Sequence, residues 1–412
     1  MILISGNTLT LSAETNKADD IVILYTNDVH CAIDTNIGYD GLALYKKEMQ
    51  EQHENVLLVD AGDAIHGAPV GELENGAYMI SLMNAVGYDA AAIGNHEFYY
   101  GMTELLKRGQ ELDCGYICSN LCDENGKTVY QPYKIIEAGE HKIAFVGVTT
   151  PDSIKSPSSP QDDGHTYSLG SDGTVFERIQ TAVDSARSEG ADYVILLAHL
   201  GEKNVSKKWN AEQTVKNLSG IDAVIDGHSH EVTKGITYKS KDNKNVTVTQ
   251  TGTKLVNIGK MTISADGSIT TELISSVPKP DSESSISEND YFKPDGKKYG
   301  YADKAVNTKI KIVNSKLDPS SSEIIGHTDF ALYDNDYKTG IRRVRNGETN
   351  LGDLCADAYR YILDTDAAIV GGAAIRAGIN AGDIIAASVL SLGSSVCSAE
   401  VTGQQIYVPT VS

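Results

Sequence analysis

Side chains of the types that can bind metal ions follow several short apolar runs in this sequence. Asp28 and His30 come soon after the run Ile21–Tyr25, and Asp63 comes after Val56–Val59. The other members of the set are Asn95 and His96 after Ala90–Ile93, His199 after Tyr193–Ala198, and His228 and His230 after Ala223–Ile225. One such residue alone is more often part of a solvated turn. Their recurrence after successive apolar runs instead indicates a shared site.

The donor atoms of this set are carboxylate and amide oxygens and imidazole nitrogens. That mixture favours zinc, manganese, iron or cobalt over a structural zinc bound by thiolates. We predict two ions, because a carboxylate such as Asp63 can bridge a pair. Such a pair polarises a phosphoryl group and lowers the pKa of a bound water. The neighbouring glycines Gly62, Gly94 and Gly227 are expected to permit the tight turns that aim the side chains.

The apolar runs, which also include Ile143–Val148, have the length and the Val and Ile content of buried strands. Segments with apolar residues at helical spacing lie between them, at Gly41–Glu54, Ala77–Val86 and Phe176–Glu189. This alternation predicts an α/β domain in which helices cover the faces of a sheet. Because the carboxyl ends of the strands converge in such a domain, residues far apart in the sequence are expected to meet there.

A second region follows the polar stretch Ser275–Ser287, which is typical of a linker. The elements predicted for it are a helix at Tyr301–Val313, a strand within Glu323–Leu332, a helix at Asn350–Leu363, and strand-like segments at Ala367–Val370 and Val401–Val408. We therefore predict an N-terminal tail (1–18), a first domain (19–275), a linker with a connecting helix (276–320) and a second domain (321–412).

Composition excludes several classes of partner. The 412 residues carry a formal net charge of −21, which argues against nonspecific binding to nucleic acid or to an anionic membrane. No stretch has the roughly 20 apolar residues that span a bilayer, so no transmembrane segment is predicted. The mildly apolar residues 1–13 are interpreted as the remnant of a signal peptide. An extracellular, cell-surface or periplasmic location is therefore expected.

Five short blocks of the first domain resemble those of the calcineurin-like metallophosphoesterases. They are Asn27-Asp28-Val29-His30, Gly62-Asp63-Ala64-Ile65, Gly94-Asn95-His96-Glu97-Phe98, Ala198-His199-Leu200-Gly201 and Gly227-His228-Ser229-His230. The chain is most similar to the 5′-nucleotidase branch, which includes UDP-sugar hydrolases and 2′,3′-cyclic-nucleotide phosphodiesterases. The resemblance implies a four-layered α/β/β/α sandwich as the catalytic domain, followed by a separate α+β substrate-binding domain.

The resemblance also implies roles for the individual residues. One ion is expected on Asp28, His30, Asp63 and His230, and the other on Asp63, Asn95, His199 and His228. The remaining histidine of the set, His96, is then expected to contact the phosphate or the leaving-group oxygen. Zinc or manganese is the expected metal, with iron and cobalt as alternatives.

Two blocks of the second region resemble the nucleotide-binding segments of the same branch. One is Arg345 with residues 347–354, and the other is residues 371–377, which contain Arg376. The resemblance makes both arginines ligands of the phosphate or ribose side of a nucleotide. Guanidinium groups suit this role because they bind anionic oxygens in pairs.

The chain departs from the family pattern at several positions. Tyr99 stands where the family usually has an Asp that orients the catalytic histidine, and Leu392 stands where it has a stacking aromatic. In residues 371–376, a glycine replaces the family's Asn. The family's C-terminal domain also continues further, so a truncated, partial domain is expected here.

These observations predict a phosphoesterase that depends on two metal ions and hydrolyses nucleotide phosphate esters by in-line attack of a metal-bound hydroxide. A 2′,3′-cyclic-nucleotide phosphodiesterase and a phosphatase of broad specificity are alternatives within the same chemistry. A nucleotide-binding protein without catalytic activity is the alternative from a different class.

Overall fold

The computed structural model describes residues 18–154, 161–171, 174–202, 205–275, 290–292, 301–316, 323–335, 343–344, 347–372, 375, 378–385 and 389. Contacts divide the chain into two units. The first unit comprises Met1–Ala64 and Ile80–Ile310, and the second comprises Ile65–Met79 and Lys311–Ser412. The seven predicted metal ligands and His96 all belong to the first unit.

Two six-stranded sheets form the centre of the first unit. The first sheet has the order β12 (Ile269–Ile274), β11 (Ile258–Ile263), β1 (Ala18–Thr26), β2 (His53–Asp60), β3 (Ala90–Ala92) and β4 (Tyr116–Ile117). The second has the order β5 (Tyr133–Ala138), β6 (His141–Thr149), β7 (Tyr193–His199), β8 (Ala223–Ile225), β10 (Asn245–Thr251) and β9 (Val232–Lys239). The strands β1 to β4 are parallel to one another, as are β6, β7, β8 and β10.

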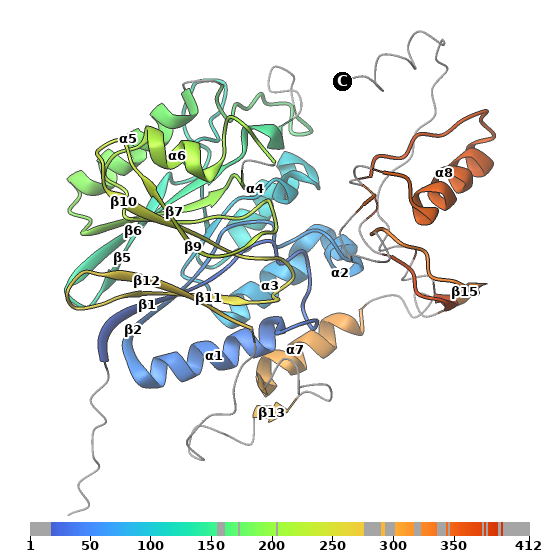
Figure 1. Ribbon diagram of the computed structural model, residues 1–412, viewed down its shortest axis with the longest axis horizontal. Helices are drawn as coiled ribbons and strands as arrows, with labels where there is room; N and C mark the ends of the chain where they lie inside the picture. The colour runs from blue at the N-terminus through green and yellow to red at the C-terminus, as the bar shows by residue number, and fades with distance from the viewer. Residues whose placement is uncertain are drawn as a thin grey trace, which may run out of the picture. The chain divides into compact units, whose positions relative to one another are not determined.

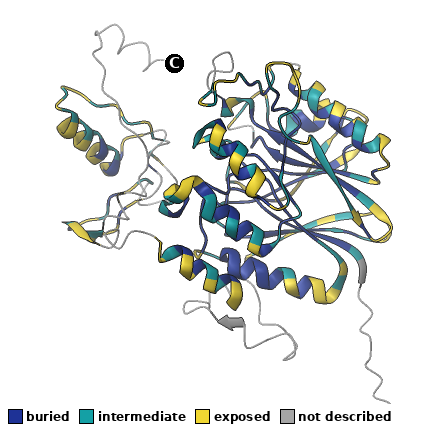
Figure 2. Ribbon diagram, turned by 180° about the vertical axis from the view of Figure 1, so that it is seen from behind, coloured by how far each residue is buried: buried dark blue, intermediate teal, exposed yellow. Residues whose placement is uncertain are grey.

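Apolar residues on both faces of the strands account for this arrangement. In β6, Ile143 and Phe145 join the core between the two sheets, whereas Ala144 and Val146 join a second core on the outer face. Alternate side chains of a strand point to opposite faces, so a continuous apolar run buries both. Figure 2 shows the resulting buried strands in dark blue.

Helices cover the outer faces of the two sheets, as Figure 1 shows. α5 (Thr174–Ser188) and α6 (Ala211–Asn217) pack on the second sheet through Val175, Ile179 and Val215, and α1 (Gly38–Gln52) packs on β1 and β2. The resulting layers are α/β/β/α, as predicted. The other helices are α2 (Pro69–Glu72), α3 (Ala77–Val86), α4 (Gly101–Glu111), α7 (Lys304–Asn314) and α8 (Asn350–Leu363), with short 3-10 turns η1 (Leu73–Gly76), η2 (His96–Phe98) and η3 (Pro151–Ser153). None of the helices in the described part of the chain has the length and apolar character needed to cross a bilayer.

The second unit has its own small core. Leu332, Leu351, Cys355, Ile375 and Ile379 pack together in it. Its strands β15 (Ile324–Thr328) and β16 (Gly382–Ile385) are antiparallel, and a further antiparallel pair, β13 (Asp290–Phe292) with β14 (Tyr301–Asp303), belongs to the first unit. α8 begins after Thr349, whose hydroxyl accepts a hydrogen bond from the backbone N–H of Gly352.

Two predicted elements of the second region differ from the structure. The helix predicted from Tyr301 begins at Lys304, because residues 301–303 form β14 and the Asp303 carboxylate caps the helix by accepting the N–H of Val306. The strand predicted at Ala367–Val370 is wrong, because these residues form no strand. No described strand pairs with them, and Ile369 is 76% exposed. The segment Val401–Val408 and the tail 1–17 lie outside the described residues.

Candidate metal centre

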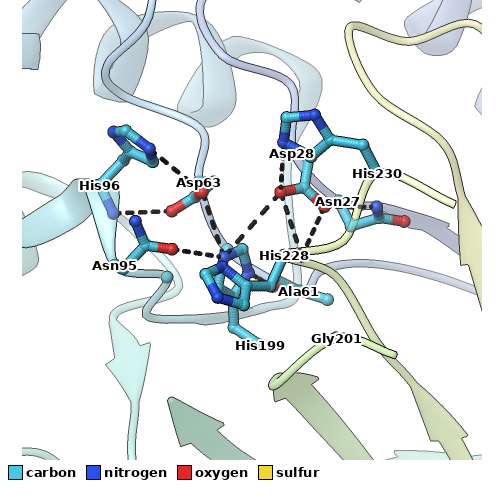
Figure 3. Close-up of polar contacts among 12 residues, drawn as sticks. Asn27, Asp28, Ala61, Asp63, Asn95, His96, His199, Gly201, His228 and His230 are labelled. Carbon is cyan, nitrogen blue, oxygen red and sulfur yellow. Dashed lines mark hydrogen bonds and ion pairs between the residues drawn. The ribbon is translucent and has the colours of Figure 1, made fainter. Parts of the chain in front are cut away.

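The predicted ligands gather at the carboxyl ends of five strands. Asp28 and His30 follow β1, Asp63 follows β2 and Asn95 follows β3. On the second sheet, His199 ends β7, and His228 and His230 follow β8. Figure 3 shows Asp28 and Asp63 on either side of His199, with dashed lines from that imidazole to both carboxylates and to Asn95.

Asp28, His30 and His230 form the first group of ligand atoms. The two imidazole Nε2 atoms lie 3.0 Å apart, and Nε2 of His230 lies 3.3 Å from Oδ1 of Asp28. Two nitrogens that bind one tetrahedral ion at about 2.1 Å lie about 3.4 Å from each other. The spacing of these donor atoms therefore suits a single ion of the zinc class.

Asp63, His199 and His228 form the second group. Nε2 of His199 lies 3.1 Å from Oδ2 of Asp63 and 3.2 Å from Oδ1 of Asn95. The ring of His228 lies 5.1 Å from that of His199, measured between centroids. These oxygen and nitrogen donors are again those that suit zinc, manganese or iron.

Asp63 lies between the two groups. Its Oδ2 atom is 3.1 Å from His199 Nε2 of the second group and 3.6 Å from His30 Nε2 of the first. This position is the one that a carboxylate shared by a pair of ions requires.

A backbone carbonyl fixes the orientation of the His199 ring. Nδ1 of His199 lies 2.8 Å from the carbonyl oxygen of Ala61. A carbonyl oxygen can only accept, so Nδ1 carries a proton, and Nε2 is the ring nitrogen that faces Asp63 and is left to bind a metal ion. Metal-binding histidines are commonly oriented by a partner of this kind.

Electrostatic effects concentrate charge in the second group. Burial favours the neutral form of the Asp63 carboxyl, but His199 and His96 hold its pKa well below the usual range. Burial disfavours the charged form of His199, yet Asp63 and Asp28 raise its pKa to about 10. Burial and the neighbouring His199 lower the pKa of His228 to about 4. The buried carboxylates thus draw positive charge into the site, which is the electrostatic setting that suits a divalent cation.

The backbone is strained at most of the predicted ligands. Asp28, His30, Asp63, His228 and His230 have φ values of 51°, 47°, 62°, 79° and 60°. This left-handed conformation costs non-glycine residues on the order of 1–3 kcal/mol each and tends to occur at functional sites. Its concentration here indicates that the surrounding fold holds these side chains in positions that an unstrained loop does not provide.

The role expected for the glycines needs correction at two of three positions. Only Gly62 has a positive φ, of +93°. Gly94 and Gly227 are needed because other atoms approach closely. A Cβ on Gly94 overlaps the Asp63 carboxylate and lies 2.5 Å from its backbone nitrogen, and a Cβ on Gly227 lies 2.9 Å from an Asp28 carboxylate oxygen.

Glu97 has a positioning role that sequence reasoning missed. It is 1% exposed, and its carboxylate accepts the backbone N–H groups of Asp63, Ala64 and Gly94 at 2.7–2.8 Å. These bonds hold the loop after β2 against the loop after β3. Asn27 acts similarly on the first group, because its amide nitrogen donates to the Asp28 carboxylate at 2.7 Å. Both residues belong to the sequence blocks that resemble the family. Their membership of these blocks is the sequence feature from which a role in the site could have been inferred.

His96 borders both groups. Its backbone N–H donates to Oδ1 of Asp63 at 2.7 Å, and its Nε2 atom lies 3.9 Å from Oδ2 of the same residue. Its ring stands edge-on to that of His30, with 4.8 Å between centroids. Tyr99 comes one 3-10 turn later and is 43% exposed. Arg345 and Arg376 lie outside the described residues.

Comparison with known proteins assigns the family. Residues 21–232 match the calcineurin-like phosphoesterases, and residues 324–408 match the 5′-nucleotidase C-terminal domain. The chain is 25% identical, over 94% of its length, to a trifunctional nucleotide phosphoesterase of Bacillus subtilis, of which it spans 27%. It is also 25% identical, over 94% of its length, to a 5′-nucleotidase of Vibrio parahaemolyticus, of which it spans 73%.

A solved structure shares the fold. The crystal structure of a 5′-nucleotidase precursor from Thermus thermophilus aligns with a TM-score of 0.73 and 19% identity, covering 91% of this chain and 73% of that one. The family match extends over more than half of the sequence and includes the strands that carry the two groups of ligands. The chain is therefore a hydrolase that belongs to the calcineurin-like phosphoesterases and carries a 5′-nucleotidase C-terminal domain.

Proposed function

We propose that this protein hydrolyses nucleotide phosphate esters at the site formed by Asp28, Asp63 and the surrounding histidines. The observation that carries the proposal is the position of Asp63 between two groups of nitrogen and oxygen donors. The first ion is assigned to Asp28, His30, Asp63 and His230, and the second to Asp63, Asn95, His199 and His228. When bound, two divalent ions supply Lewis acidity toward a phosphoryl group and activate water near neutral pH.

Other residues of the protein support this chemistry by holding the candidate ligands and His96 in position. Ala61 and Glu97 fix the positions of His199 and Asp63, as described above. His96 is proposed as the catalytic residue that contacts the phosphate or the leaving-group oxygen. Its side chain is 15% exposed, so a substrate can reach it. The backbone bond to Asp63 meanwhile keeps it beside the metal ligands.

Nucleotides are the proposed substrates. The relatives from Bacillus subtilis and Vibrio parahaemolyticus are named as a nucleotide phosphoesterase and a 5′-nucleotidase, and the second domain matches the C-terminal domain of 5′-nucleotidases. Arg345 and Arg376 are proposed to bind the nucleotide through its anionic or ribose oxygens.

Substitution of two histidines separates catalysis from metal binding. His228→Ala is expected to reduce the metal content, because it removes a nitrogen ligand of the second group. His96→Ala is expected to keep the metal content and to lower kcat by about 10²-fold or more, because it removes a contact made in the transition state. Elemental analysis and hydrolysis of AMP and of an aryl phosphate test both variants. Equal activity of His96→Ala and the unaltered protein contradicts the role assigned to His96.

Arginine substitutions test whether Arg345 and Arg376 bind a nucleotide substrate. Arg345→Ala and Arg376→Ala are each expected to raise KM for AMP about tenfold or more, because each removes a charge-assisted pair of hydrogen bonds. The rate on a small aryl phosphate is expected to stay within about twofold, since the metal ligands are untouched. If both variants keep the KM of the unaltered protein for AMP, these arginines do not bind nucleotides. Faster hydrolysis of 2′,3′-cyclic AMP than of AMP favours the cyclic phosphodiesterase instead.

A further inference from the structure

Asp226 links the two loops that carry histidines on the second sheet. It follows the last residue of β8 and is fully buried. Its Oδ1 atom accepts the backbone N–H groups of Leu200 at 2.9 Å and Gly201 at 3.2 Å. These two residues come directly after His199, so one carboxylate oxygen holds the chain where that ligand leaves β7.

The other carboxylate oxygen reaches the second loop through Gln250. The Gln250 amide nitrogen donates to Oδ2 of Asp226 at 3.1 Å, and its amide oxygen accepts the Ser229 hydroxyl at 2.9 Å. Ser229 lies between His228 and His230 in the sequence. A continuous hydrogen-bonded path therefore runs from the end of β7 to the loop of these two histidines.

The two loops pack closely, so a hydrogen-bonded path between them fixes the position of one relative to the other. A Cβ on Gly201 lies 3.3 Å from the backbone nitrogen of Ser229 and 3.4 Å from Cδ2 of His228. The two loops are therefore in near contact, and a small shift of either one moves imidazoles that serve different ions. Both Asp226 oxygens already accept N–H groups, so the carboxylate is not placed as a metal ligand. Asp226 also belongs to none of the described groups of metal-competent atoms.

We propose that Asp226 is a positioning residue, which aligns His199 with His228 and His230 so that two divalent ions can bind. It acts through the hydrogen-bonded path of Leu200, Gly201, Gln250 and Ser229. The inference rests on the metal site of the proposed function. Substitution of the partners that orient metal ligands typically weakens metal binding 10- to 100-fold.

The experiment measures binding of Zn²⁺ to the metal-free protein by calorimetry, together with kcat/KM on an aryl phosphate. Asp226→Ala is expected to weaken Zn²⁺ binding about 10- to 100-fold. Asp226→Asn is expected to recover most of this affinity. Its amide oxygen can still accept from Leu200 and Gly201, and a turned Gln250 amide can accept from its nitrogen. Recovery by the uncharged isostere shows that geometry, rather than negative charge, is what Asp226 provides.

Asp222→Ala is the matched control, because Asp222 stands at the opposite end of β8. Its half-buried carboxylate accepts the backbone N–H of Val194 at 2.7 Å and forms an ion pair with Arg187, so this substitution also removes hydrogen bonds that join the start of β8 to β7 and α5. We expect it to lower the unfolding temperature without changing Zn²⁺ affinity. If Asp226→Ala lowers the unfolding temperature in the same way and binds Zn²⁺ as tightly as the unaltered protein, its role is structural and the proposal is wrong.

Two further variants test the path if Asp226→Ala does not fold. Gln250→Ala and Ser229→Ala are each expected to weaken Zn²⁺ binding, and the double variant is expected to lose little more than Gln250→Ala alone, because both interrupt one path. Unchanged Zn²⁺ affinity in both single variants also overturns the proposal. Failure of the unaltered protein to bind Zn²⁺ or hydrolyse phosphate esters instead contradicts the proposed function itself.

Discussion

Gly94→Ala is expected to abolish most of the hydrolysis of phosphate esters, although it adds only one methyl group. The added Cβ overlaps the Asp63 carboxylate and lies 2.5 Å from the Asp63 backbone nitrogen. Neither neighbour can move freely, because Glu97 holds that nitrogen and the carboxylate lies between both groups of ligands. A displacement of about 1 Å in an active site can cost a factor of 10² in rate. We therefore expect kcat/KM to fall at least about a hundredfold, with a reduced metal content by elemental analysis.

Gly326→Ala is the control for this experiment. Gly326 lies in β15, and among the described residues an added Cβ there meets only Ile384, at 3.9 Å, which is an ordinary contact. This variant is expected to keep the metal content and the rate. A Gly94→Ala protein that still holds its ions and hydrolyses an aryl phosphate at the original rate shows that the loop after β3 can retreat. In that case the close approach of Gly94 and Asp63 is not essential.

The apolar runs predicted an α/β domain because its strands are buried on both faces, whereas the sandwich of two sheets was implied by the family resemblance. The run Ile143–Val148 was recognisable as a strand since both sets of alternating side chains are apolar, and each set enters a different core. Helices with one apolar face were equally clear, and α3 and α8 have the predicted ends. Elements of the second region were harder, because the start of α7 depends on the pairing of β14 with β13, and Ala367–Val370 lacks a described partner strand.

The proximity of the candidate ligands was predictable because parallel strands bring their carboxyl ends together. Asp28, Asp63 and His199 could be placed at converging strand ends without coordinates, since each lies at or just after the end of a recognisable strand. The residues that orient them could not be found this way. Glu97 and Asp226 act on backbone N–H groups of other loops, and those groups leave no mark in the sequence. The need for glycine at Gly94 likewise arises from a neighbouring loop rather than from its own φ.

Removal of the metal ions is expected to abolish activity and to lower the unfolding temperature. Without the ions, Asp28 and Asp63 remain buried and repel each other, and the left-handed backbone at the candidate ligands lacks the metal bonds that are expected to stabilise it. A ligand present at 1,000 times its Kd stabilises the folded state by about 4 kcal/mol, so the shift should be easily measurable. The measurement compares calorimetric unfolding and aryl phosphate hydrolysis before and after dialysis against a chelator. Zn²⁺ or Mn²⁺ added back should restore both properties.

The number of ions that each variant retains tests the assignment of ligands to the two groups. We expect about two ions per chain in the unaltered protein, because one carboxylate can bridge a pair. His230→Ala should keep about one ion, since it removes a ligand of the first group only. Asp63→Ala should lose both ions, because Asp63 lies within reach of each group.

His141→Ala is the matched control, because His141 lies at the start of β6 and pairs with Asp192 rather than with a candidate ligand. If Asp63→Ala retains as much metal as His230→Ala, the carboxylate does not bridge and the two ions bind independently. If the unaltered protein retains no metal and its activity survives the chelator, the dinuclear site itself is refuted.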